Sequence, residues 1–412
     1  MAIPFFSIDL TAKDYLIIVM NIFFPFNKKK VEDKFKAVLS DRYPNKFISL
    51  MPSGRLGFYL TMKFLFKEND LILFSSMSFP LYVKIARQLK LRVKLIDVSE
   101  NDLNVNYENL KNIEEDCKGL VITHLFGFPC QIEKILEICQ KKNIKLIEDC
   151  AQSFGSKYNG IETGNFGEVG IISTSLLKTP TTLSGGFLVT ENKILHNEIE
   201  RWLEKELSNN FFDKFKLFIK IVVFLLNSYP RVYSILSDKI FFFLKKYQPR
   251  TYRKILYSGM GMKNITFDPK ERPKLSKFQI SMGLSQLHRC EEMKLKRRRN
   301  SQYLQSKLVN SKKIKVINDH FSSNWNHQYF VIKINKDFDK IFNKIFENGV
   351  HIMDENVWDC SKYNFKIENK EKDFEVGRKY DGSLIRIQNN SFLKIKEIDK
   401  IASIIIKTCD EI

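Results

Sequence analysis

Residues 144–178 begin Ile144-Lys-Leu-Ile-Glu-Asp-Cys-Ala-Gln and end Val169-Gly-Ile-Ile-Ser-Thr-Ser-Leu-Leu-Lys. Each half opens with a short apolar run, of the kind that forms a buried strand, and then turns polar. Asp149 closes the first run, and Lys178 follows the second. Two parallel strands joined by a crossover would bring both side chains to the same end of one sheet. We therefore expect an acid and a lysine to meet there as a candidate functional pair.

Other apolar runs alternate with helical periodicity along the chain. The expected strands are 71–74, 93–96 and 120–123, and the expected helices between them are 82–89 and 132–140. Such alternation predicts βαβ units and a mostly parallel sheet. From about Asn326 the chain has its own strands, 329–334 and 383–387, and its own helices, 340–348 and 395–407. The sequence therefore predicts an α/β protein in which a large domain is followed by a smaller α+β domain.

The central block resembles a known family. The residues that carry the resemblance are Glu-Asp-Cys-Ala-Gln (148–152), Lys178 and Gly185-Gly186. Together they closely resemble the DegT/StrS family, the nucleotide-sugar aminotransferases of fold type I that use pyridoxal 5′-phosphate (PLP). The resemblance extends from about Val31 to the C-terminus. It implies a PLP enzyme that transfers an amino group, with glutamate as donor, to a keto-sugar carried on a nucleotide, for a surface polysaccharide or glycoconjugate.

The same resemblance implies roles around the cofactor ring. Lys178 would bond PLP in the resting state and later carry a proton between the substrate α-carbon and C4′ of the cofactor. Asp149 would keep the pyridine nitrogen protonated, and Gln152, one helical turn on, would contact the ring hydroxyl. Phe79 matches the aromatic residue that stacks on the ring, although in a chain with 35 phenylalanines a core position is an alternative.

A second set of residues matches the family's phosphate site. Met51-Pro-Ser-Gly-Arg resembles the Ser-Gly turn that opens a helix whose backbone N–H groups hold the PLP phosphate. Gly54 would allow close approach, and Arg55 would supply an N–H and a side chain able to reach phosphate. Ser173 matches the hydroxyl that bonds the phosphate. Taken alone, the turn would be read as a plain helix start.

Three stretches depart from the family pattern. Leu183-Ser-Gly-Gly stands for Gly-Glu-Gly-Gly, and Arg272-Pro-Lys274 stands for Asn-Tyr-Arg. The family's asparagine reaches the phosphate across a homodimer, so we expect a dimer in which Arg272 or Lys274 takes over that contact. The loop 349–359 lacks the usual tyrosine and histidine. These changes put the substrate in doubt and leave the cofactor chemistry intact.

Cysteine spacing, the N-terminal residues and net charge bear on the kind of protein and on its partners. The seven cysteines have neither paired nor metal-ligand spacing, which favours reduced thiols and no metal site in a cytoplasmic protein. The N-terminus has no basic stretch followed by an apolar one, so we expect no signal peptide. A net charge of +20 suits nucleotide diphosphates or an anionic membrane as well as nucleic acid. Since the basic run 294–299 is interpreted as a solvated helix face, we expect no nucleic-acid partner.

The segment from Phe211 to Tyr247 combines apolar runs with lysines. Its longest uncharged stretch, Ile221 to Pro230, is too short to span a membrane. We expect two helices hinged near Pro230, packed either on protein or, as a peripheral hairpin, on the inner face of the membrane. The expected organisation is an N-terminal segment at 1–30, a large PLP-binding domain at 31–198, a helical insertion at about 199–262, return helices at 263–325 and a small C-terminal domain at 326–412.

Two other functions compete with amino transfer. PLP-dependent sugar dehydratases of the family carry histidine in place of the lysine, so Lys178 argues against that activity. A degenerate member acting as a membrane-associated scaffold is the other alternative, motivated by the altered motifs and by residues 211–247.

Overall fold

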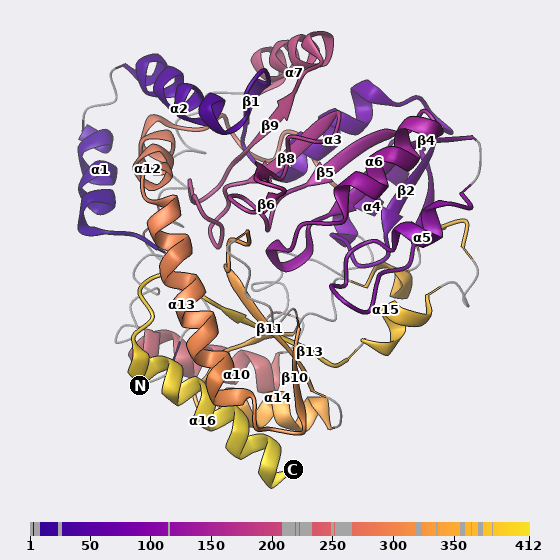
Figure 1. Ribbon diagram of the computed structural model, residues 1–412. Coiled ribbons are helices and arrows are strands. Elements are labelled where there is room, and N and C mark those ends of the chain that lie inside the picture. The colour runs from indigo at the N-terminus through magenta and orange to yellow at the C-terminus, as the bar shows by residue number, and fades with distance from the viewer. Residues whose placement is uncertain are drawn as a thin grey trace.

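The computed structural model, shown in Figure 1, describes most of the chain. The described residues are 3, 9–23, 27–113, 116–207, 219, 222, 233–248, 251, 266–317, 324–334, 337–354, 359–363, 365–369, 374–380 and 382–412. Two sheets organise them, the first in the N-terminal half of the chain and the second near the C-terminus.

The first sheet has seven strands in the order β1-β9-β8-β5-β4-β2-β3. The strands are β1 (Phe47–Met51), β2 (Leu71–Ser75), β3 (Arg92–Ile96), β4 (Cys117–Thr123), β5 (Lys145–Asp149), β8 (Val169–Ser173) and β9 (Gly186–Thr190). Strands β3, β2, β4, β5 and β8 pair in parallel, and β9 is antiparallel to both of its neighbours. The prediction of a mostly parallel sheet is therefore confirmed, including the adjacent parallel pair β5 and β8.

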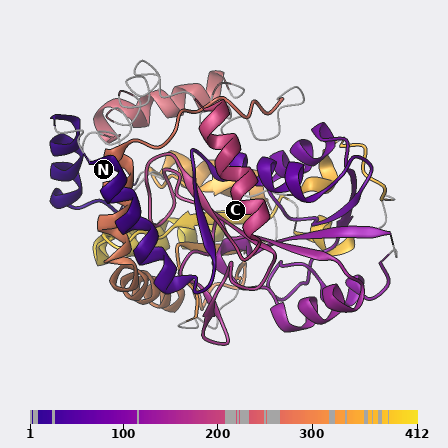
Figure 2. The ribbon, with the colours of Figure 1, turned by 90° about the horizontal axis from the view of Figure 1, so that it is seen from above.

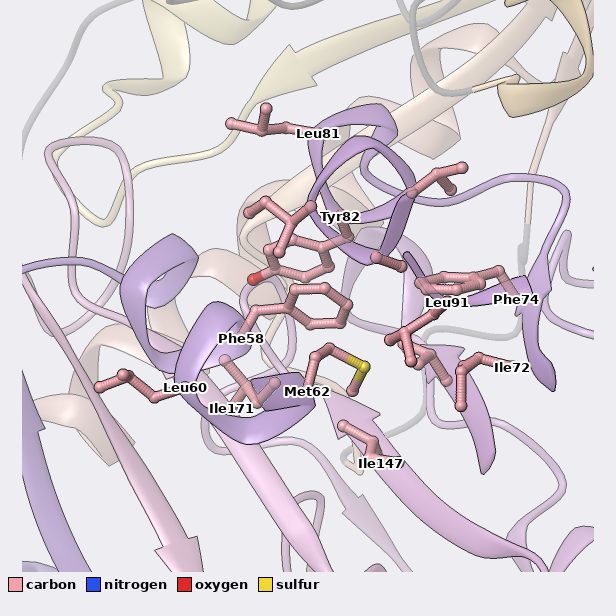
Figure 3. Close-up of a cluster of buried hydrophobic side chains, with 14 of the residues drawn as sticks. Phe58, Leu60, Met62, Ile72, Phe74, Leu81, Tyr82, Leu91, Ile147 and Ile171 are labelled. Atoms are coloured by element: carbon pink, nitrogen blue, oxygen red, sulfur yellow. The ribbon is translucent and has the colours of Figure 1, made fainter. Parts of the chain in front are cut away.

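Helices cover both faces of this sheet because its strands are apolar on both sides. In β2, Ile72 and Phe74 join one buried cluster, while Leu71 and Leu73 join another. The first cluster includes residues of α3 (Gly54–Leu65), α4 (Pro80–Gln88) and α7 (Lys193–Glu206), and the second includes residues of α5 (Tyr107–Leu110) and α6 (Ile132–Lys141). Figure 3 shows the first cluster, in which helices α3 and α4 meet above the strands. Both faces of the sheet are thus buried under helices.

The second sheet is smaller and antiparallel, in the order β10-β11-β13-β12. Its strands are β10 (Ile314–Val316), β11 (Tyr329–Ile334), β12 (Met353–Asp354) and β13 (Leu384–Gln388). Helices α13 (Cys290–Leu308), α14 (Phe338–Glu347) and α16 (Ile395–Glu411) share one buried cluster with it. Figure 1 shows the long α13 running from the level of the first sheet down to the second. The expected small α+β unit is present.

Helices α1 (Ala12–Phe23), α2 (Lys28–Arg42) and α12 (Lys277–Leu287) lie together at one edge of the molecule, as Figure 2 shows from above. Two-residue strands β6 (Lys157–Tyr158) and β7 (Ile161–Glu162) form a hairpin in the crossover between β5 and β8. A short α15 (Glu375–Lys379) follows the loop after β12. Helix α7 runs across positions 198 and 199, the predicted boundary between the large domain and the insertion.

The first of the two helices expected in residues 211–247 falls on 211–232, of which only 219 and 222 are described. The second corresponds to α10 (Asp238–Tyr247). The Lys245 ammonium lies 4.6 Å from the ring centre of Phe342 and 4.0 Å from that of Phe346, both on α14. Yet Ile240 and Phe243 remain exposed. In the described part of the chain, no helix is both long and apolar enough to cross a bilayer.

Candidate active site

Asp149 lies at the carboxyl end of β5 and is almost fully buried. Its Oδ1 accepts a hydrogen bond from the backbone N–H of Ala151 at 3.0 Å, and its Oδ2 accepts one from the hydroxyl of Thr123 at 3.4 Å. Burial raises the pKa of the Asp149 carboxyl, while the bond from Ala151 and the charge of Lys178 oppose that rise. A buried carboxyl group with these contacts is suited to pair with a cationic N–H group.

Lys178 follows β8 in a turn, where its backbone N–H donates to the carbonyl of Ser175 at 2.9 Å. Its Nζ donates to the hydroxyl of Tyr329 at 3.0 Å and lies 5.4 Å from the centre of that ring. Tyr329 is the first residue of β11, so the second sheet contacts the lysine directly. The charge of Lys178 acts on the Asp149 carboxyl, and the two residues lie at the ends of the adjacent strands β5 and β8, as the sequence predicts.

Gln152 is buried one turn after Asp149 and carries an unsatisfied donor. Its Oε1 accepts a hydrogen bond from the backbone N–H of Phe126 at 3.0 Å, which orients the amide. Its Nε2 has no hydrogen-bond partner among the described residues. A buried donor without an acceptor costs roughly 1–3 kcal/mol. An oxygen of a bound group, such as the ring hydroxyl of PLP, would satisfy it.

The first turn of α3 lies beside the end of β8. The Ser53 hydroxyl caps α3 by accepting from the N–H of Leu56 at 3.2 Å, which leaves the N–H groups of Gly54 and Arg55 for another acceptor. A Cβ added at Gly54 would lie 3.3 Å from Cβ of Ser173, and one added at Gly186 would lie 3.0 Å from the nitrogen of Gly54. The backbone packing at this corner therefore depends on the two glycines, and it forms an anion cradle that suits a phosphate.

Phe79 follows β2 and is half-buried between two apolar clusters. Its ring meets Tyr82 edge-on, with ring centres 5.1 Å apart, and Tyr82 stacks on Phe58 at 4.0 Å, as Figure 3 shows. The Tyr82 hydroxyl would lie 3.6 Å from a Cβ added at Gly54. Phe79 thus belongs to an aromatic wall beside α3, a position that suits its predicted stacking role.

Sequence reasoning missed a buried pair that supports this edge of the sheet. His124 Nε2 and Glu148 Oε2 lie 3.0 Å apart, and Glu148 also accepts from the N–H groups of Gly164, Phe166 and Gly167 at 2.7–2.8 Å. Burial opposes ionisation of Glu148, but these bonds outweigh it and lower its pKa.

The side chains of His124, Glu148 and Cys150 lie close enough to hold a metal ion. However, His124 Nδ1 accepts from the N–H of Cys130 at 3.1 Å, so Nε2 carries the proton that Glu148 accepts. Both imidazole nitrogens and both carboxylate oxygens are therefore already used. The pair is a scaffold that fixes the chain between β5 and β8, directly next to Asp149.

The stretches that depart from the family pattern lie around this site as well. Arg272 donates from Nη1 to the hydroxyl of Ser184 at 2.6 Å. Asp359 forms a bridge with Met77, and the N–H of Cys360 donates to the carbonyl of Ser76 at 2.8 Å, which brings the described end of the loop 349–359 to the end of β2. Lys274 is half-buried.

Comparison with known proteins agrees with this geometry. GDP-perosamine synthase of Escherichia coli O157:H7 is 26% identical over 199 residues, which are 47% of this chain and 55% of that protein. GDP-4-keto-6-deoxy-D-mannose 3-dehydratase of Yersinia pseudotuberculosis is 28% identical over 172 residues, 40% of this chain and 44% of that protein. The matches thus span about half the length of these relatives.

Similarity of fold covers the whole molecule. The structure of PseC from Helicobacter pylori, an aminotransferase involved in the biosynthesis of pseudoaminic acid, superposes with a TM-score of 0.76 at 14% identity and covers 100% of both chains. Residues 26–216 and 253–405 match a family model, and only 217–252 interrupt the match. The chain belongs to the DegT/DnrJ/EryC1/StrS aminotransferase family.

Proposed function

We propose that this protein is a PLP-dependent aminotransferase that converts a nucleotide-linked keto-deoxysugar to an amino sugar, with glutamate as donor. The product would serve the synthesis of a surface polysaccharide or glycoconjugate. The observation that carries the proposal is the meeting of Lys178, Asp149 and the unsatisfied amide of Gln152 at one edge of the sheet. Family membership and the similarity to a perosamine synthase support the same activity.

Bound PLP would supply the electron sink that amino transfer requires. Asp149 would hold the proton on the pyridine nitrogen, and Gln152 would orient the ring through its hydroxyl. Lys178 would hold the cofactor at rest and, once released, move a proton with its Nζ. The Tyr329 hydroxyl would accept a hydrogen bond from that Nζ, as it does in this structure. Gly54, Arg55 and Ser173 would bind the phosphate, with Phe79 against the ring.

The dehydratase reading has one observation in its favour, the similarity to the Yersinia enzyme of that name. Lys178 favours amino transfer, because it offers the primary amine that the family's dehydratases are expected to lack. A scaffold without cofactor would leave the donor of Gln152 unsatisfied, which counts against that reading.

We further propose that the protein is a cytoplasmic homodimer. Each subunit would have a PLP-binding domain up to residue 198 and a small domain from residue 326. A peripheral membrane contact through 211–247 is the finer part of this proposal. The exposed Ile240 and Phe243 of α10 support it, although α10 also packs on α14. Flotation with anionic liposomes, with and without residues 211–247, would test it; binding that survives the deletion would refute it.

The proposed activity is tested with purified protein, PLP and a panel of 3-keto and 4-keto nucleotide sugars. We expect visible absorbance from bound cofactor and, by mass spectrometry, glutamate-dependent formation of one amino sugar. A deoxygenated product without added nitrogen would instead identify a dehydratase. If the protein binds no PLP at all, the alternative of a degenerate family member acting as a scaffold is supported.

A further inference from the structure

Two of the stretches that depart from the family pattern are in direct contact. Arg272 lies shortly before α12, and Ser184 lies before β9. The Ser184 hydroxyl accepts from Arg272 Nη1 at 2.6 Å and donates to the carbonyl of Pro52 at 3.1 Å. Pro52 immediately precedes Ser53, the residue that caps α3. Ser184 thus anchors the guanidinium of Arg272 beside the first turn of α3, within a single chain.

A second cation lies in the same place. Arg55 is the second residue of α3, and its charge is close enough to act on Arg272. Burial, followed by the charge of Arg55, lowers the pKa of Arg272 to about 10, and the charge of the neighbouring Glu271 opposes this shift. Within the described chain neither guanidinium has a carboxylate in ion-pairing distance. Two half-buried cations at the positive end of a helix are unfavourable together unless an anion lies near both.

The identity of residue 184 fits this view. A carboxylate there would form an ion pair with Arg272 and neutralise it, because the two side chains already touch. A hydroxyl instead fixes the guanidinium in position without a direct ion pair. The remaining N–H groups of the guanidinium, together with those of Gly54 and Arg55 on α3, then form a set of donors suited to a group with several anionic oxygens.

We propose that Arg272 and Arg55 clamp a phosphate group at the N-terminus of α3, and that Arg272 does so within its own chain. The clamp rests on the proposed function, since the phosphate would come from PLP or from the diphosphate of the nucleotide sugar. It replaces the contact that the resemblance assigns to an asparagine of the neighbouring subunit. Each subunit would therefore complete this part of its own site.

The first experiment measures the dissociation constants of PLP and of pyridoxal, which lacks the phosphate, with apo protein. The variants are Arg272→Gln, Arg272→Lys and Ser184→Glu, and Arg299→Gln on the exposed face of α13 is the matched control. Loss of a charge-assisted bond should weaken PLP binding about tenfold to a hundredfold in Arg272→Gln and Ser184→Glu. Arg272→Lys should lose less. Pyridoxal binding should change less than about twofold, because it makes no such bond.

A second arm distinguishes the two sources of phosphate. GDP and UDP are titrated into the PLP-loaded protein and the same variants by calorimetry. If PLP binding weakens and nucleotide binding does not, the clamp holds the cofactor phosphate; the reverse assigns it to the nucleotide. If neither weakens more than in Arg299→Gln, the clamp is refuted. Wild-type protein that transaminates while Arg272→Gln binds both ligands normally would refute the clamp alone, whereas wild-type protein without PLP would refute the proposed function.

A third arm tests whether Arg272 acts within its own chain. Lys178→Ala and Arg272→Gln subunits are mixed, and exchange is verified by native mass spectrometry of mass-tagged chains. If Arg272 serves its own site, one site of each mixed dimer lacks the lysine and the other lacks the arginine. The activity of each site that retains Lys178 then stays at the level of the Arg272→Gln parent. Recovery towards half of the wild-type activity would show that Arg272 serves the neighbouring site and would overturn this part of the proposal.

Discussion

At the ring end of the proposed site, Asp149 and Gln152 are almost fully buried and are oriented by hydrogen bonds from Ala151 and Phe126. At the phosphate end, Arg55 and Arg272 are half-buried, and neither forms an ion pair with a described carboxylate, although the charge of Glu271 acts on Arg272. The ring end is thus built from short-range contacts at strand ends. The phosphate end is built from two positive charges, which the proposed phosphate would balance.

This difference indicates where the molecule tolerates change. At the ring end, Asp149 follows directly after Glu148, which is bonded to His124 and Gly164, so altering this stretch disturbs chemistry or folding. At the phosphate end, Ser184 and Arg272 come from the loops before β9 and α12, and their contact indicates that a residue there can change together with its neighbour. Variants at the ring end should therefore affect turnover, and variants at the phosphate end should affect binding.

The largest effect is expected from Lys178→Ala. Removing the amine that holds the cofactor and moves the proton should reduce turnover by at least about 10⁴-fold. PLP should still bind through its phosphate, because the phosphate end is intact. Lys145→Ala, an exposed lysine at the opposite end of β5, is the control. Steady-state kinetics that differ less than tenfold between the two variants would remove Lys178 from the mechanism.

Asp149→Asn should reduce turnover by about 10²- to 10⁴-fold, because the neutral amide holds the pyridinium proton poorly. Although the substitution lowers turnover, it should not lower the free energy of unfolding. Since burial raises the pKa of Asp149, ionisation costs stability as the pH rises from the ordinary carboxyl range through the raised value.

Above that window, apo Asp149→Asn should therefore be at least as stable as the parent in urea unfolding. A marked loss of stability at neutral pH would mean that the charge of Asp149 supports the fold rather than the cofactor.

Glu148→Gln tests the support of the ring end. Its amide would face backbone N–H groups, so the free energy of unfolding should fall by about 2–4 kcal/mol. Because the folded pKa of Glu148 is lowered, the parent has this stability above the ordinary glutamate pKa and loses it as the pH falls through the folded value. Chemical unfolding across pH checks both points, with the exposed Glu137→Gln as control. Equal stability of the two variants would contradict the role of Glu148 in fixing the chain between β5 and β8.

Tyr329→Phe should have the smallest effect. Losing the hydroxyl that accepts from Lys178 should lower kcat by about tenfold or less and shift its pH profile, with KM nearly unchanged. Tyr303→Phe, which removes a hydroxyl bonded to Asp399, is the matched control. A change in KM alone would place Tyr329 in substrate binding instead.

The sequence predicted what is local. The runs ending at Asp149 and Ser173 form adjacent parallel strands, because apolar patterning and crossover rules determine their pairing. Tyr329 was missed because it lies 151 residues from Lys178, and no pattern near β11 indicates that contact.

The contact between Ser184 and Arg272 spans 88 residues, so the sequence likewise does not predict it, although both positions depart from the family pattern. Glu148 was read only as part of a motif, since its acceptor role depends on backbone N–H groups that only the folded chain brings together.

The most direct test of the account is borohydride reduction of the PLP-loaded protein, followed by peptide mapping. Reduction fixes the cofactor to the lysine that it is bonded to. We predict that the pyridoxyl group is found on Lys178, in stoichiometric amount, and that the Arg272→Gln variant is labelled at the same residue once PLP is raised to saturation. A label on any other lysine, or no label on protein that binds PLP, would contradict the assignment of Lys178.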